Sequence, residues 1–180
     1  MARSVAKGVM KISDQCDLVV AAEVQILNEW QAQHTFSETF EVFPDWLARP
    51  DPSWAARTLK EEHVKALMMS FRQTGKCNKG IIGCVANDDV HSKWLEAVSV
   101  GTLSPAAKAK FLQDHVIMDP DLSIQVVSGD HSREALSRLH EAKPNALPWK
   151  SVKVELIITP VNDKATDNLR VIGVRENLRF

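Results

Sequence analysis

Hydrophobic residues along this chain follow the two spacings that distinguish helices from strands. Apolar residues three or four positions apart predict helices over residues 13–33, 58–75, 104–115 and 130–142. Alternating or continuous runs of β-branched and aromatic residues predict extended segments over residues 36–43, 79–87, 122–129 and 151–161. The order of these elements predicts a single α/β or α+β domain with a small mixed sheet, flanking helices and an inserted helical segment.

Polar and helix-breaking residues set the predicted ends of two of these helices. Thr58 and Glu61 have the spacing of a capping box, and Gly75 is expected to end the helix that they begin. Ser104 is expected to cap the next helix, with Pro105 in its first position.

Charge and cysteine content narrow the class of protein. The chain has 180 residues, 22 of them basic and 23 acidic, so its formal charge of -1 provides no global attraction to nucleic acids or membranes. The three cysteines, at positions 16, 77 and 84, lack the spacing of a zinc site and the density of a disulfide framework. They favour a reducing intracellular compartment, the cytoplasm or the nucleus. No apolar run approaches the roughly 20 residues of a membrane span, so no membrane anchor is expected.

The stretch GDHSRE, residues 129–134, joins a predicted strand to a predicted helix. A glycine at this junction permits positive φ and close approach of a ligand, and the helix start offers unpaired N–H groups to that ligand. His131 and Arg133 add hydrogen-bond donors beside the positive end of the helix dipole, and an arginine can bind phosphate oxygens through two bonds. The combination predicts an anion site, with phosphate as the anion.

A purely structural interpretation of the same residues stays open. Asp130 has the side chain of an ordinary N-cap, Gly129 suits a tight turn, and Arg133 can belong to a solvated face. Glu134 could act as a catalytic base that positions water for hydrolysis, but an acidic residue is favourable in any first helical turn.

Four segments, in order along the chain, carry a resemblance to a known group of proteins. They read PSWAARTL, HVKALMMSFRQTGKCNKGIIGCV, VVSGDHSREAL and VKVELIIT. Over residues 50–160 this order resembles the ParB/sulfiredoxin superfamily. The resemblance implies a domain at 49–162 with an insertion at 87–120 that carries one helix. A helical and extended segment at 1–48 precedes this domain, and a tail at 163–180, whose apolar pattern predicts no single element, follows it.

The resemblance also implies a ligand, a nucleoside triphosphate such as CTP or ATP with Mg²⁺. Five residues of the loop would cradle its phosphates: Gly129, Asp130, His131, Ser132 and Arg133. Ser70 would contact a phosphate or Mg²⁺, and Arg57 would reach in from the WAAR segment. The turn from Thr74 to Lys79 would border the base or the sugar, which adds Lys79 to the site.

The sequence departs from that family at two positions of the loop. Ser132 stands where the family usually has an arginine, and Arg133 comes one place later. Asp130 stands where sulfiredoxins carry their catalytic cysteine, so sulfiredoxin activity is not expected. The chain also ends soon after the third predicted strand, which leaves no room for the DNA-reading domain of ParB. A larger parent chain is one explanation that stays open.

Three functions remain open. The first is a nucleotide-binding ParB-like domain, with or without slow NTP hydrolysis, that acts in DNA maintenance or modification and contacts DNA. The second is a ParB-like nuclease, although the sequence shows no evident carboxylate cluster for two metal ions. The third is a degenerate module that has lost the ligand and binds a protein partner. No metal site is expected, because His63, His131 and His140 lack the spacing of a helical zinc site.

Overall fold

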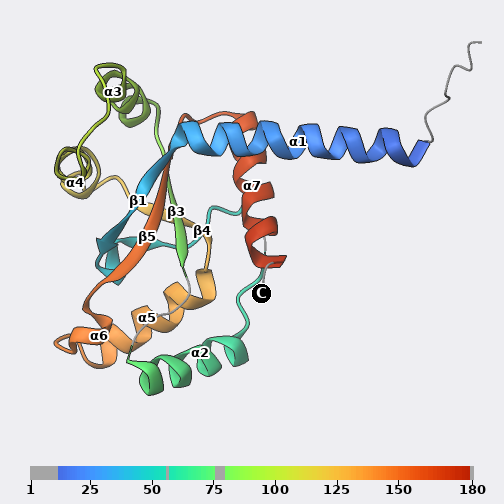
Figure 1. The fold of residues 1–180 in the computed structure, drawn as a ribbon. Helices are drawn as coiled ribbons and strands as arrows, with labels where there is room; N and C mark the ends of the chain where they lie inside the picture. Colours follow the sequence, from blue (N-terminus) through green and yellow to red (C-terminus); the bar gives the residue numbers. More distant parts are fainter. Residues whose placement is uncertain (1–11, 56, 76–79, 179–180) are drawn as a thin grey trace, which may run out of the picture. The chain divides into compact units, whose positions relative to one another are not determined.

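The computed structural model describes residues 12–55, 57–75 and 80–178 (Figure 1). The chain divides into two compact units, Met1–Gln33 and His34–Phe180. The described part of the first unit is helical and belongs to α1 (Ile12–His34). This confirms the helix predicted over residues 13–33.

The second unit contains a five-stranded mixed sheet. Its strands are β1 (Thr35–Val42), β2 (Leu47–Ala48), β3 (Ile81–Ala86), β4 (Ile124–Ser128) and β5 (Val152–Thr159), in the spatial order β1-β5-β3-β4-β2. Strand β5 is antiparallel to β1 and parallel to β3, while β4 is antiparallel to β3 and parallel to β2. The predicted α/β class with a small mixed sheet is confirmed.

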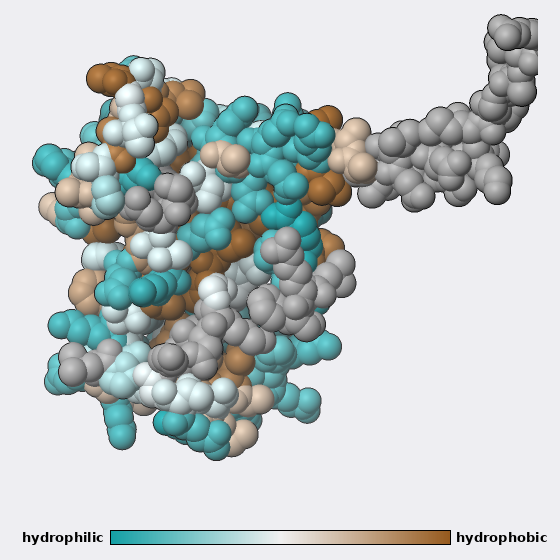
Figure 2. Space-filling model, in the orientation of Figure 1, coloured by the Kyte–Doolittle hydropathy of each residue, from teal (hydrophilic) through white to brown (hydrophobic). Residues whose placement is uncertain are grey.

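Helices flank the sheet and form the long insertion. They are α2 (Glu61–Thr74), α3 (Asp88–Ser99), α4 (Pro105–Leu112), α5 (Asp130–Ala142), α6 (Leu147–Lys150) and α7 (Asp163–Leu178), with a 3-10 turn η1 (Pro44–Trp46) and a π-helical turn η2 (Gln113–Ile117). Helices α2 and α5 lie side by side (Figure 1), and α7 packs on β4. Where α2 forms the lower edge of the face in Figure 2, teal and white residues predominate, as expected for the outer side of an amphipathic helix.

The core forms on both faces of the sheet. Leu156 and Ile158 of β5 cluster with Phe71 of α2 and Leu136 of α5. The intervening Ile157 points to the opposite face and is fully buried as well, because successive side chains of a strand alternate. Burial on both faces explains why β3 and the second half of β5 are almost continuously apolar, whereas the first half of β5 alternates between apolar residues and the polar Lys153 and Glu155.

Helix α2 begins later than predicted. Its first residue is Glu61 and its N-cap is Lys60, with no side-chain cap, so the predicted capping box of Thr58 and Glu61 is wrong. The predicted end is confirmed, because Gly75 has φ 69° and its N–H donates to the Phe71 carbonyl at 2.8 Å.

The segment 87–120 contains more helix than predicted. The helix after Ser104 is confirmed, and the Ser104 hydroxyl accepts the Ala107 N–H at 3.2 Å. Helix α3, which precedes it, was not predicted, because Val90 and Trp94 are its only fully buried residues and its apolar stripe is short. The tail, whose pattern predicted no single element, forms α7.

The predicted division at 1–48, 49–162 and 163–180 stays a prediction. Strands β1 and β2, from the first of these segments, pair in the same sheet as the strands of the second. Among the described residues, no helix combines the length and hydrophobicity needed to cross a bilayer.

Candidate functional site

The junction between β4 and α5 requires a glycine. Gly129 has φ 96°, and a Cβ at this position would lie 3.2 Å from Cγ1 of Ile81 and 3.3 Å from the carbonyl oxygen of Gly80. A side chain would therefore be strained by the backbone conformation and crowded by the start of β3. The expected positive φ is confirmed, and the close approach brings the start of β3 to the start of α5.

The first turn of α5 keeps unpaired N–H groups. The first helical bond runs from the Arg133 N–H to the Gly129 carbonyl at 2.9 Å, so the N–H groups of residues 130–132 have no partner inside the helix. Within the described chain, no side chain caps this helix start. Asp130 lies at the first helical position rather than at the N-cap.

Arg133 is buried beside two carboxylates. Its side chain is only 8% exposed, its Nε donates to Oδ1 of Asp130 at 2.8 Å, and its Nη2 donates to Oε2 of Glu134 at 2.9 Å. In this arrangement the single positive charge of the guanidinium is shared between Asp130 and Glu134. Its predicted direct contact with a phosphate stays a prediction, and the observed geometry favours a supporting part instead.

A second arginine connects α5 to α2. Arg138 donates through Nε to Oε1 of Glu134 at 2.9 Å and through Nη1 to Oε1 of Glu61 at 2.7 Å. Although burial acts to raise it, the pKa of Glu134 is lowered by the hydrogen bonds and charges of Arg138 and Arg133. A carboxylate held in this way is a weak base, so the geometry does not favour Glu134 as the catalytic base.

His131 ties the two helices together. Its Nε2 accepts the backbone N–H of Lys60, the N-cap residue of α2, at 3.0 Å. Its ring lies 4.7 Å from that of His63, centroid to centroid. Burial is the largest cause that lowers the pKa of His131, followed by the charge of His63. Asp130 acts to raise this pKa, and Arg57 and Lys60 make smaller contributions that lower it. His131 is therefore neutral at neutral pH, as its acceptor role requires.

The other predicted site residues are spread along α2 and the segment before it. Arg57 is exposed and close enough for its charge to act on His131. Ser70 is exposed, and with a helical rise of 1.5 Å per residue it lies about 15 Å along α2 from the Lys60–His131 contact. Lys79 lies outside the described residues. The structure thus brings Arg57 to the start of α5 but not Ser70.

Sequence analysis missed the part that Lys60, Glu61 and Arg138 play here. Glu61 and Arg138 are 77 positions apart, and no local pattern indicates that they meet. Among the described residues, no group of three His, Cys, Asp or Glu side chains could hold a metal ion. His140, the third histidine considered in the sequence, lies 3.7 Å from Oδ2 of Asp45 at the other end of α5.

The comparison with solved structures finds a similar protein, whereas the other two comparisons find none. No family model matches the chain, and no curated protein matches it. The chain is similar to the C-terminally truncated chromosome-partitioning protein ParB from Caulobacter crescentus, whose structure was solved in complex with CTP-gamma-S. The identity is 20%, the TM-score is 0.45, and the match covers 80% of this chain and 54% of that chain. This chain therefore spans about half the length of that protein, and membership of the superfamily stays a prediction.

Proposed function

We propose that this chain is a ParB-like nucleotide-binding domain in which the first turn of α5 binds a phosphate group. One observation carries the proposal: α5 begins directly after a glycine in the left-handed region, and its first three N–H groups have no intrahelical partner. Such a helix start favours an anion, because its N–H groups can donate to the anion and the helix dipole is positive there.

The charges around this helix start support an anionic ligand. Arg57 and Lys60 are exposed, and both act on His131 in the first turn of α5. The negative charge of Asp130 is offset by its ion pair with Arg133. We propose that Arg57 and Lys60 contact phosphate oxygens directly, and that Arg133 supports the site by holding Asp130.

Backbone groups provide the remaining contacts of this proposal. Gly129 lets the chain approach the phosphate, and the N–H groups of Asp130, His131 and Ser132 donate to it. Mg²⁺ would come with the nucleotide, held mainly by phosphate oxygens and water, as this ion usually is. Ser70 and Lys79 remain predicted contacts to Mg²⁺ or to other parts of the nucleotide.

The proposed ligand is a nucleoside triphosphate, with CTP and ATP as the first candidates, and the proposed role lies in DNA maintenance or modification. Hydrolysis is not part of the proposal, because the two arginines around Glu134 leave it a weak base. No specific observation favours a nuclease.

Thermal unfolding with CTP, ATP, GTP and UTP, each with Mg²⁺, tests the proposal. A nucleotide present at a hundred times its dissociation constant should stabilise the protein by about 2.7 kcal/mol. The double substitution Arg57→Ala and Lys60→Ala should remove most of this shift, whereas Lys65→Ala with Arg72→Ala, which removes two exposed cations elsewhere on α2, should retain it. If no nucleotide raises the melting temperature at millimolar concentration, the degenerate protein-binding module becomes the better hypothesis.

A further inference from the structure

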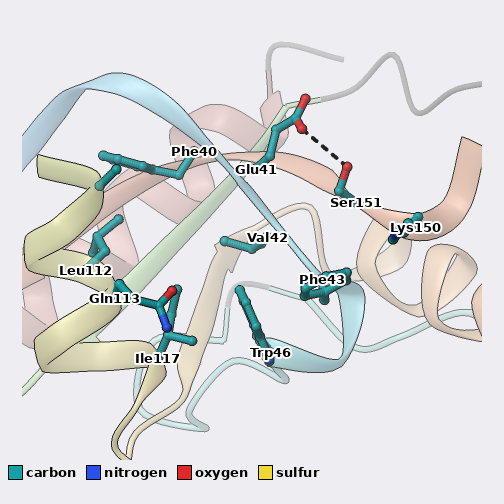
Figure 3. Close-up of a pocket in the computed structure, with 11 residues that line it drawn as sticks. Phe40, Glu41, Val42, Phe43, Trp46, Leu112, Gln113, Ile117, Lys150 and Ser151 are labelled. Atoms are coloured by element: carbon teal, nitrogen blue, oxygen red, sulfur yellow. Dashed lines mark hydrogen bonds between the residues drawn. The ribbon is translucent and has the colours of Figure 1, made fainter. Parts of the chain in front are cut away.

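A pocket lies beside β1, an edge strand of the sheet. Its volume is about 460 Å³, within the range of small-molecule pockets. It is bounded by β1 and η1 on one side and by α4 and the π-helical turn η2 on the other (Figure 3). None of its lining residues belongs to the proposed phosphate site, so it is a separate feature of the fold.

The walls of this pocket are mainly aromatic and aliphatic. Phe40 and Val42 come from β1, Trp46 from η1, and Leu112 and Ile117 from the insertion (Figure 3). At the rim, Phe43 packs edge-on against Trp46 with ring centroids 4.8 Å apart, yet Phe43 stays 39% exposed. Aromatic side chains that are only partly covered by the chain itself offer stacking area to a planar ligand.

One wall of the pocket is a π-helical turn. The Met118 N–H donates to the Gln113 carbonyl, five residues earlier, at 3.1 Å, which widens the helix over residues 113–117. Gln113 and Ile117, the two ends of this turn, both line the pocket. Single π-turns are rare and occur frequently at functional sites, because they redirect side chains that an α-helix would place elsewhere.

The polar groups of the pocket favour a negatively charged ligand. Lys150 is the one cationic residue among the described residues that line it, and no carboxylate of the described chain forms an ion pair with its ammonium group. The one carboxylate of the lining, Glu41, faces Ser151, whose hydroxyl donates to it at 3.5 Å (Figure 3). Glu41 follows Phe40 and precedes Val42 on β1, so its side chain leaves the strand on the opposite face from theirs.

We propose that this pocket binds a small organic anion with a planar aromatic body, of the class of aromatic carboxylates. The ring would lie among Phe40, Trp46 and Ile117, the carboxylate would pair with Lys150, and the Gln113 amide would supply a further hydrogen bond. Volume, aromatic lining, the π-turn and the unpaired lysine all come from one place in the fold, and the proposal does not depend on nucleotide binding.

Titration with 2-naphthoate, followed by calorimetry and by tryptophan fluorescence, tests the proposal. The neutral analogue 2-naphthamide has the same ring without the charge. We expect 2-naphthoate to bind, and Lys150→Met to weaken it about two- to fivefold while 2-naphthamide is unaffected, as expected for one partly exposed charge pair. The matched control Lys143→Met removes an exposed lysine that does not line the pocket, and it should change nothing.

A filling substitution tests the location. Ala109 lines the pocket from an exposed position of α4, so Ala109→Trp can fill the hollow without disturbing the core and should abolish binding of both probes. Ala106→Trp adds the same side chain to an exposed position of the same helix outside the pocket, and it should bind both probes normally. The proposal is overturned if the unsubstituted protein binds no 2-naphthoate at millimolar concentration, or if Ala109→Trp binds it as well as Ala106→Trp. If Lys150→Met weakened the binding of both probes equally, the proposal that the ligand is an anion paired with Lys150 would be overturned.

Discussion

Two pairs of helices in the second unit begin in different ways. Helices α3 and α4 are capped by the side chain just before them: Asn87 Oδ1 accepts the Val90 N–H at 3.0 Å, and Ser104 Oγ accepts the Ala107 N–H at 3.2 Å. Helices α2 and α5 lack such caps. The N-cap residue of α2 is bound instead by His131, 71 positions away, and α5 begins after a glycine.

The starts of α3 and α4 are therefore determined by local sequence, whereas α2 and α5 stabilise each other's starts through contacts between them. The insertion helices need only their neighbours to begin, whereas α2 and α5 are joined by the contacts of His131 and Arg138 across the pair. A helix start without a local cap leaves N–H groups that water or a ligand must satisfy. The comparison therefore explains why the candidate phosphate site lies at α5 and not at α3 or α4.

The largest expected effect comes from removing the central cation of the α5 network. Arg133→Met leaves the carboxylates of Asp130 and Glu134, which are 12% and 22% exposed, without this partner. We expect the free energy of unfolding to fall by about 3 kcal/mol, since breaking a buried ion pair strands a charge. Urea unfolding at pH 7 measures this change.

The matched substitution in the insertion is Lys110→Met. It breaks the ion pair with Asp114, in which the side chain of Lys110 is 77% exposed and that of Asp114 45% exposed, and it should lower the free energy of unfolding far less than Arg133→Met does. Equal losses for the two variants would contradict the view that α5 depends on its charge network more than α4 depends on its surface pair.

The next effect compares Gly129, which precedes α5, with Gly75, which follows α2; both have positive φ. Gly129→Ala should cost about 2 kcal/mol, because the alanine is strained and also meets Ile81 and Gly80. Gly75→Ala has the same kind of backbone strain but no atom within 4 Å of the new methyl group, so about 1 kcal/mol is expected. The difference between the two variants in urea unfolding measures the close packing at the start of α5. A difference of zero would show that this packing does not constrain residue 129.

Removing the local caps should have a smaller effect. Asn87→Ala and Ser104→Ala are each expected to lower the free energy of unfolding by about 1 kcal/mol, the usual worth of an N-cap side chain. Thr58→Ala serves as the control, because Thr58 has cap-like sequence spacing but α2 begins at Glu61 without a side-chain cap. A loss for Thr58→Ala as large as that for Ser104→Ala would restore the predicted capping box.

The same contrast decides what could be predicted from the sequence. Ser104 with Pro105 and the end of α2 at Gly75 were predicted correctly, because each signal and its partner lie within a few residues. The sheet class also followed from local apolar runs. The predicted start of α2 at Thr58 was wrong. The group that binds the actual N-cap residue, Lys60, is His131, and no spacing rule connects these two positions.

Some features of the candidate site could likewise be predicted from local sequence, and others could not. The glycine with positive φ and the open helix start follow from the GDHSRE stretch alone. The burial of Arg133 and the Glu61–Arg138 contact depend on how α2 packs on α5, and the sequence does not indicate that packing. The sequence therefore predicted that the polar residues of the loop contact a phosphate, whereas in the structure Arg133 binds Asp130 and Glu134.

The smallest expected effect is a pH dependence that involves one histidine in each region. Burial, followed by the charge of His63, lowers the pKa of His131, and burial, followed by the charge of His34, lowers the pKa of His91, while Asp130 and Asp88 oppose these shifts. In each case the unfolded chain binds the proton more readily than the folded protein does.

The stability contributed by these two neutral histidines is therefore complete above the unfolded pKa of about 6.5 and is lost as the pH falls through and below that value. When the pH falls from 7.5 to 5.5, the unsubstituted protein should lose free energy of unfolding as these histidines become protonated. In His131→Asn and in His91→Asn this loss should be smaller by at most about 1 kcal/mol, since both side chains are only partly buried. Carboxylates with lowered pKa values, such as Glu61 and Glu134, titrate below this window and do not interfere.

Nucleotide-induced stabilisation separates the two regions: His131→Asn alters the contact that holds Lys60 beside α5 and should weaken that stabilisation, whereas His91→Asn should leave it unchanged. If both variants changed it equally, the dependence of the phosphate site on the α2–α5 contact would be refuted, and only the shared loss of a partly buried histidine would remain.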